Sequence, residues 1–263
     1  MCASKEMSKF AKPTMSIQNP YKEVEHKVFK RTFLQETEVV VNFEPPMTSE
    51  EFSTRIVPFV NKTFNQNIPG AIDKATERAE LTSIDSQVKF DFSIKSAKVV
   101  IGSSAYKSFS ASVIQYIAIL ANFLRDVAHA ELLVNTSINK INIWPIQSKD
   151  SKMSFRGASL FIFKKEHIDD IANIKFEESD YPVSAAKEAV VNCGDSASLK
   201  AVIRVELKDA ENASFMLGLK AQTTNIDVND LMADLPKLND IIFGAFTDIV
   251  SNNILDLMSK ETL

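Results

Sequence analysis

The fold is decided at residues 86–102, which read SQVKFDFSIKSAKVVIG. From Val88 to Ile94 apolar and polar residues alternate, which predicts a strand with one buried face. A turn at 95–96 then leads into a second run rich in β-branched residues. We therefore expect these residues to form an antiparallel hairpin.

A long helix is expected directly after this hairpin. The apolar residues between Tyr106 and Ala130 recur with the 3.6-residue period of a helix. The most apolar stretch, 111–124, is too short to span a bilayer, because a spanning helix needs about 20 apolar residues. We therefore predict a buried helix and no membrane contact.

The same order occurs again near the C-terminus. Alternating runs at 198–208 and 214–222 are followed by a long amphipathic helix, expected to continue from about 235 to 259. Hairpin and helix thus appear twice, at 86–130 and at 198–259, either through duplication or because the unit is common.

Several further elements are expected. The helices are one from Phe52 to Phe64, preceded by the capping box Thr48/Glu51, a short one around Ala71–Leu81 and a short one at Glu166–Asn173. The strands are Thr37–Phe43, Leu132–Val134, Thr136–Ile143, Phe155–Phe163 and Lys187–Cys193.

These patterns predict an α+β protein of two related lobes, each an antiparallel sheet with a long helix packed across one face. We expect a flexible N-terminal arm over 1–18, an N-terminal lobe over 19–145 and a C-terminal lobe over 146–263, with the lobes sharing one core. Consecutive hairpins argue against a doubly wound parallel fold.

Glycine is scarce, with six in 263 residues, where average usage of about 7% would give roughly 18. Phosphate-binding loops, dinucleotide turns and nucleophile elbows need glycine, since it alone lets the backbone approach a ligand closely. None of these motifs can be written here. We therefore expect no cofactor and a function performed by side-chain surfaces.

The cysteines and the charges indicate the compartment and the class of partner. Cys2 and Cys193 are the only cysteines and no secretory signal is visible, so we expect a cytoplasmic protein.

Residues 1–31 carry a net charge of +4, and residues 165–263 carry −9. The basic segment makes a weak case for nucleic-acid binding, whereas the acidic third argues against it. A protein partner, or a homodimer, is the favoured expectation.

Two sets of residues are candidates for a site. Asn135 and Asn139 lie two strand periods apart and therefore share one sheet face, which either lines a polar cleft or is an exposed face of the sheet. Trp144 is either an interface anchor or a core residue. The alternative is a metal site built from acidic residues and a histidine: Glu177, Glu178, Asp180 and His167.

Three stretches, in order, resemble a sporadically distributed bacterial family of uncharacterised proteins of about this length. They are Asn19-Pro20 with Glu23-Val24, the strand Ser137–Ile141, and Asp227 followed by Leu238–Ile242 and Phe246. This chain has serine in place of an aromatic residue before Ile138, and asparagine where the family often has histidine in the last helix. The resemblance implies no activity. The patchy distribution of that family resembles, by analogy, that of mobile or defence-associated genes.

We therefore expect a non-enzymatic protein-binding or regulatory protein, part of a bacterial defence or toxin–antitoxin-like system. The alternative is a metal-assisted hydrolase that uses the acidic residues and His167 named above.

Overall fold

The computed structural model describes residues 16–21, 29, 32–64, 70–73, 77–147, 155–173, 182–209 and 212–260. Its first half contains β1 (Leu34–Glu44), α1 (Ser49–Phe64), β2 (Gly70–Asp73), β3 (Arg78–Thr82), β4 (Val88–Ser93) and β5 (Ser96–Gly102), then a continuous helical segment made of the π-helical turn η1 (Phe109–Val113), α2 (Ile114–Phe123) and the π-helical turn η2 (Leu124–Ala128).

The second half begins with β6 (Leu132–Gln147), the longest strand. It continues with α3 (Phe155–Ile162), α4 (Lys165–Ala172), β7 (Val183–Asn192), β8 (Ala197–Leu207), β9 (Asn212–Thr223), the short β10 (Ile226–Asp227), the 3-10 turn η4 (Val228–Asp230), α5 (Leu231–Ile249) and α6 (Asn252–Ser259).

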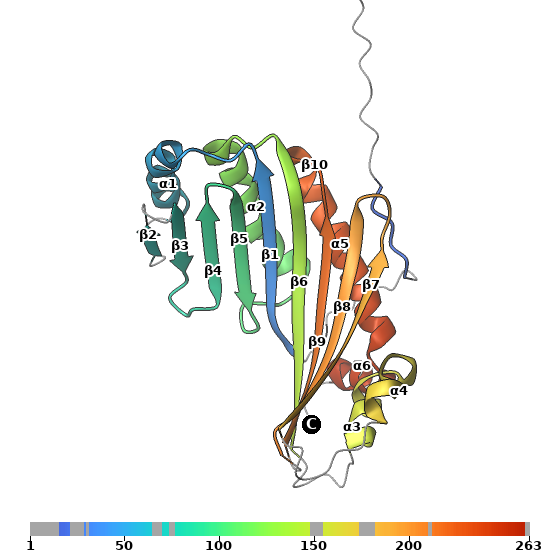
Figure 1. Cartoon of the computed structure of the whole chain (residues 1–263). Helices are drawn as coiled ribbons and strands as arrows, with labels where there is room; N and C mark the ends of the chain where they lie inside the picture. The colour runs from blue at the N-terminus through green and yellow to red at the C-terminus, as the bar shows by residue number, and fades with distance from the viewer. Residues whose placement is uncertain are drawn as a thin grey trace, which may run out of the picture.

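All strand pairs are antiparallel, and they join into one sheet of order β2-β3-β4-β5-β1-β6-β9-β8-β7, with β10 paired to β6 (Figure 1). The α+β class is as expected. The hairpins β4–β5 and β8–β9 lie on opposite sides of the central pair β1–β6. The boundary expected between 145 and 146 falls inside β6, so the two halves share one sheet.

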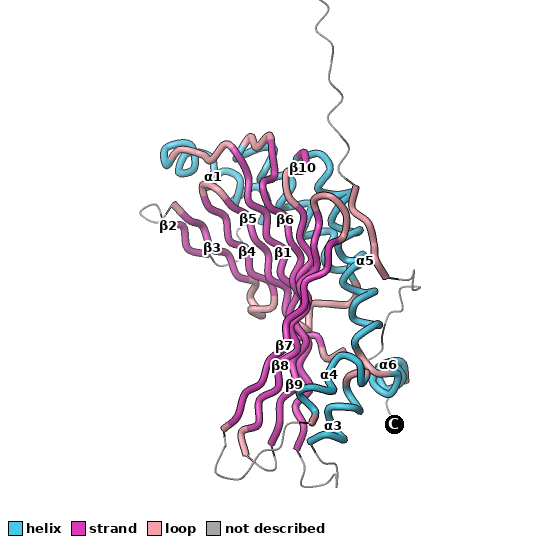
Figure 2. Tube along the Cα trace, turned by 45° about the vertical axis from the view of Figure 1, so that its right-hand side comes forward, coloured by secondary structure: helices cyan, strands magenta, loops and turns pink. Residues whose placement is uncertain are grey.

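The helices cover one face of this sheet (Figure 2). α5 packs on β9, β6 and β8, whereas α2 packs on β5 and contacts α5. Strand residues that face the helices, such as Val39, Phe92 and Leu219, are fully buried and belong to a single hydrophobic core. Within the described residues, one helical segment, Phe109–Ala128, is long and apolar enough to cross a membrane by length and composition.

Two helix signals in the sequence are confirmed at the atomic level. The Thr48 amide donates to Glu51 Oε2 at 2.9 Å and the Glu51 amide donates to Thr48 Oγ1 at 3.2 Å, which forms the expected capping box of α1. The short helix expected at Glu166–Asn173 is α4.

Three local predictions are wrong. Where a helix was expected around 71–81, residues 71–73 lie in β2 and residues 78–81 in β3, because pairing of β2 with β3 and of β3 with β4 overrides their helix propensity. Phe155–Phe163 contains helix α3 instead of a strand: Phe155, Ala158 and Ile162 repeat at helical spacing and pack inward. The final helix is interrupted at Val250–Ser251, where Ser251 caps the new helix α6.

The end of the expected N-terminal arm is attached to the sheet. Ile17 forms a β-bridge with Gly194, and the Gln18 amide donates to the Cys193 carbonyl at 2.8 Å. Gly194 has a φ of 105° and lies so close to Ser16 that a side chain would collide with its carbonyl oxygen. Residues 1–15 of the arm lie outside the described residues.

Candidate functional site

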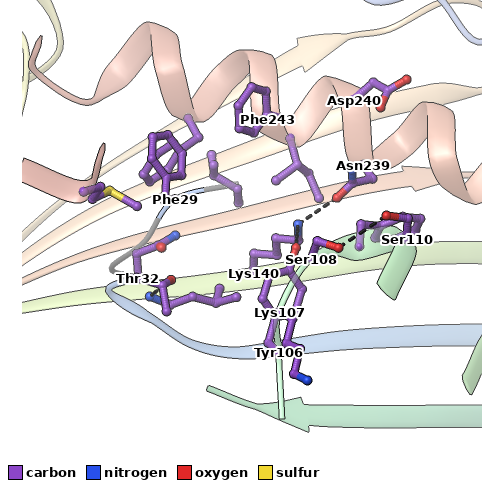
Figure 3. Close-up of a pocket in the computed structure, with 17 residues that line it drawn as sticks. Phe29, Thr32, Tyr106, Lys107, Ser108, Ser110, Lys140, Asn239, Asp240 and Phe243 are labelled. Atoms are coloured by element: carbon purple, nitrogen blue, oxygen red, sulfur yellow. Dashed lines mark hydrogen bonds between the residues drawn. The ribbon is translucent and has the colours of Figure 1, made fainter. Parts of the chain in front are cut away.

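A cavity of about 630 Å³ lies between α5, β6 and the loop that precedes η1 (Figure 3). Most of its wall is apolar, and four phenylalanines contribute to it: Phe29, Phe109, Phe243 and Phe246. Its size is that of a small-molecule site, and such sites combine apolar walls with a few placed polar groups.

Lys140 is the central polar group of this cavity. Its ammonium Nζ donates to Asn239 Oδ1 at 2.7 Å and to the Tyr106 hydroxyl at 3.0 Å. Nζ also lies 5.1 Å from the centre of the Tyr106 ring and 5.8 Å from that of Phe109, within the range of cation–π attraction. Both hydrogen-bond partners are neutral, so neither compensates the positive charge.

The periodicities of β6 and α5 place these groups. Lys140 lies directly opposite Thr37 of β1, whose side chain is fully buried, so Lys140 points to the helix-covered face of the sheet. On α5, Asn239 shares a stripe with Phe243 and Phe246 at helical spacing. A strand residue and a helix residue far apart in sequence thus meet across one layer of the core.

Hydrogen bonds hold the loop that carries Tyr106. Ser108 caps the helical segment, since its hydroxyl accepts from the Ala111 amide at 3.0 Å. The buried Ser112 hydroxyl accepts from the Lys107 amide at 2.8 Å. These bonds fix the backbone on the C-terminal side of Tyr106, so its hydroxyl is positioned before any ligand arrives.

The cavity changes the protonation chemistry of Lys140 and Tyr106. Desolvation lowers the pKa of Lys140 to about 7, and the nearby Asp240 carboxylate partly opposes this shift. Desolvation also raises the pKa of Tyr106 to about 12, so its phenol keeps its proton at neutral pH. Lys140 is therefore divided between ammonium and amine near pH 7, beside a hydroxyl that remains a proton donor.

Exchanging charge at two neighbouring positions should move the pKa of Lys140 in opposite directions. Asn239→Asp places a carboxylate where Oδ1 now lies 2.7 Å from Nζ, so the pKa should rise by about two units or more. Asp240→Asn removes an attraction and should lower it. Both shifts can be measured by NMR titration of the lysine Nζ resonances. A pKa that stays the same in both variants would contradict this account of the site.

The sequence-predicted binding residues lie elsewhere. Asn135 and Asn139 share one sheet face, as expected, but it is the face opposite the helices, where they pair with Asn42 and Glu38 of β1. Trp144 is 2 % exposed and packs between Phe33 and Phe163, so it is a core residue. None of these three residues lines the Lys140 cavity.

The alternative metal site is not assembled by the described residues. His167 lies with its Nε2 3.4 Å from an Asp248 carboxylate oxygen. Glu177, Glu178 and Asp180 lie outside the described residues. Within the part of the chain that the structure describes, no group of three or more potential metal ligands occurs.

Lys140 was missed as a site residue, although two of the stretches quoted for the family resemblance meet there. The stretch 137–141 contains Lys140, and the stretch 238–242 contains its partner Asn239. One signal for it was available: alternation in β6 puts Lys140 on the same face as Ile138 and Trp144, and a lysine on a core-facing position is unusual.

Comparison with known proteins adds little to this geometry. Neither a protein-family model nor a curated protein matches the chain. Among solved structures it is similar to Methanococcus jannaschii TBP, at 12% identity and a TM-score of 0.26, over 80% of this chain and 97% of that one. A likeness of this size supports no argument about function.

Proposed function

We propose that this protein binds a small organic anion, a carboxylate with an apolar body, in the Lys140 cavity. The observation that supports it is a lysine ammonium group in a largely apolar cavity of about 630 Å³, held by two neutral oxygens. A bound carboxylate would add a directly hydrogen-bonded negative charge to the more distant attraction of Asp240, while Phe243 and Phe246 would contact the apolar body.

The energetics favour such a ligand. A charge-assisted hydrogen bond contributes about 1.5–3 kcal/mol, and more of the Coulomb attraction survives where water is excluded. Burial of an aromatic or aliphatic body against the cavity wall adds about 25 cal/mol per Å² of apolar surface. Neither term is specific alone. Together they select acids over alcohols and apolar acids over small inorganic anions.

Binding should depend on pH in a defined direction. A carboxylate stabilises the ammonium form, so the pKa of Lys140 is higher in the complex than its value of about 7 in the free protein. Between about pH 5.5 and 7 Lys140 is mostly protonated in both states and the ligand is still a carboxylate, so affinity changes little. As pH rises above 7, binding requires uptake of a proton, and affinity should fall by up to tenfold per unit until the pKa of the complex is reached.

Isothermal titration calorimetry with 4-phenylbutyrate and the matched amide, 4-phenylbutyramide, tests the proposal. We expect the acid to bind about 10- to 100-fold more tightly than the amide, and Lys140→Met to remove that preference. Lys220→Met is the matched control, because Lys220 lies opposite Asn139 on the other face of the same sheet. Equal affinity for acid and amide in the wild-type protein would refute the proposal.

A second candidate is the protein-binding or regulatory role expected from the sequence, for which the uncovered sheet face is the supporting observation. Within the described residues the helices lie on one face of the sheet (Figure 2), and Asn135 and Asn139 lie on the other. Pull-down from the native host should recover a stoichiometric partner with wild-type protein and lose it with an Asn135→Asp/Asn139→Asp double variant. Equal recovery by both proteins would exclude this face as the contact. A link to a defence system stays a prediction.

A further inference from the structure

We infer that Lys140 is an amine nucleophile that forms an imine with an aldehyde or ketone bound in the cavity. The substrate class is a carbonyl compound with an apolar body. The inference shares with the proposed function only the use of the Lys140 cavity as a ligand site. Its ligand class is different, and its step is covalent.

The first support is placement. An amine attacks a carbonyl carbon only if it projects into the space that the carbonyl compound occupies, and Lys140 lines the cavity while its Nζ is held by Asn239 and Tyr106 (Figure 3). The two hydrogen bonds restrict the rotation of a long, flexible side chain. Positioning of this kind reduces the entropy lost on reaching the reactive geometry.

The second support is the protonation state. Only the neutral amine is nucleophilic, and a lysine with an ordinary pKa of 10.5 is almost entirely protonated at neutral pH. Desolvation lowers the pKa of Lys140 to about 7, so about half of the molecules present the free amine. The cavity thus places and deprotonates the same nitrogen.

The third support is a proton donor at the reacting nitrogen. The Tyr106 hydroxyl lies 3.0 Å from Nζ, and its raised pKa keeps it protonated. A carbonyl group whose carbon is within reaction distance of Nζ can place its oxygen within hydrogen-bond reach of this hydroxyl. Tyr106 can therefore supply the proton that the developing alkoxide needs.

The step balances without an oxidant or a metal. The Nζ lone pair forms a bond to the carbonyl carbon, and the C=O π electrons move to the oxygen, which takes the Tyr106 proton. The nitrogen returns one proton to the Tyr106 oxygen, which gives a neutral carbinolamine. The nitrogen lone pair then forms the C=N bond as the C–O bond breaks, and the hydroxyl leaves as water with the second nitrogen proton. The products are the imine and one water from one amine and one carbonyl.

Reductive trapping tests the inference on the full chain. We incubate the protein with the neutral ketone 4-phenylbutan-2-one and cyanoborohydride, which reduces an imine to a stable secondary amine, and quantify each lysine by peptide mass spectrometry. At pH 7 we expect Lys140 to be labelled at least about tenfold faster than Lys220. Its rate should level off above about pH 7, whereas labelling of surface lysines should continue to rise.

Two conservative variants, chosen to keep the fold, test the roles of the two side chains. Tyr106→Phe retains Lys140 and should slow its labelling, while Lys140→Arg keeps the positive charge and should abolish the rapid phase. If 4-phenylbutyrate binds but Lys140 is labelled no faster than Lys220, imine formation is refuted and anion binding stands. If Lys140 is labelled rapidly although no carboxylate binds, the proposed function fails and imine formation stands.

Discussion

The Lys140→Met variant should be more stable than the wild-type protein at pH 7, although we expect it to lose the preference for 4-phenylbutyrate over the amide. The difference between the ordinary lysine pKa of 10.5 and the value of about 7 in the cavity corresponds to at most about 4–5 kcal/mol. Methionine avoids this cost but leaves the oxygens of Asn239 and Tyr106 without their donor, which costs about 1–3 kcal/mol. We expect a net gain of about 1–3 kcal/mol, measured by urea unfolding.

The dependence of this gain on pH identifies its cause. Below pH 7 Lys140 is protonated in both the folded and the unfolded state, so the cost of burying its charge is fully present. Between pH 7 and 10.5 the folded protein has released the proton and the unfolded chain still holds it, so wild-type stability rises relative to the variant. The gap should therefore shrink by up to about 1.4 kcal/mol per pH unit, close within about one to three units above pH 7, and reverse by about pH 10.

Lys220→Met provides the control, because Lys220 lies on the sheet face that the helices leave open. Its stability difference from wild type should stay within about 0.5 kcal/mol and show no such trend. A Lys140→Met variant that is less stable than wild type at pH 7, or a gap that does not change with pH, would contradict the desolvation of Lys140. A residue that costs stability and lines a cavity is best explained by function.

Local patterns were sufficient for most of the fold. Alternation of apolar and polar residues over 86–102 predicts β4 and β5, and the same signal predicts β8 and β9. Each of these strands has one face towards the core and one away from it, so apolar and polar residues alternate along its sequence. The sequence pattern does not show that β1 and β6 join the two hairpins into one continuous sheet, because neighbouring strands are determined by tertiary pairing.

The local errors have the same origin. Residues 71–81 have helix-favouring composition, but 71–73 and 78–81 lie in strands because β3 pairs with both β2 and β4. Short apolar runs such as Phe155–Phe163 fit either period. The candidate site was the least predictable part, since the Lys140–Asn239 hydrogen bond joins residues 99 positions apart. Asparagines on β6 were visible as a polar run, but only the pairing register shows which face each one occupies.

Phe92→Ala should produce the largest loss of stability among the substitutions considered. Phe92 is fully buried, and its ring lies 4.6 Å from Phe123, 5.6 Å from Phe59 and 5.9 Å from Phe90, measured between centroids. Phe59 belongs to α1 and Phe123 to α2, so this one ring joins both helices to the sheet. Truncation removes these contacts and leaves a cavity, at a cost of about 3–5 kcal/mol.

Urea unfolding with two matched variants separates the packing effect from other causes. Phe92→Leu fills part of the space and should cost about 1–2 kcal/mol, whereas Ile84→Ala, at a side chain that is 84% exposed, should stay within about 0.5 kcal/mol of wild type. Because Phe92 does not line the Lys140 cavity, the folded fraction of Phe92→Ala should still prefer 4-phenylbutyrate to its amide. A cost below about 1 kcal/mol would mean that α1 and α2 are held to the sheet by other contacts.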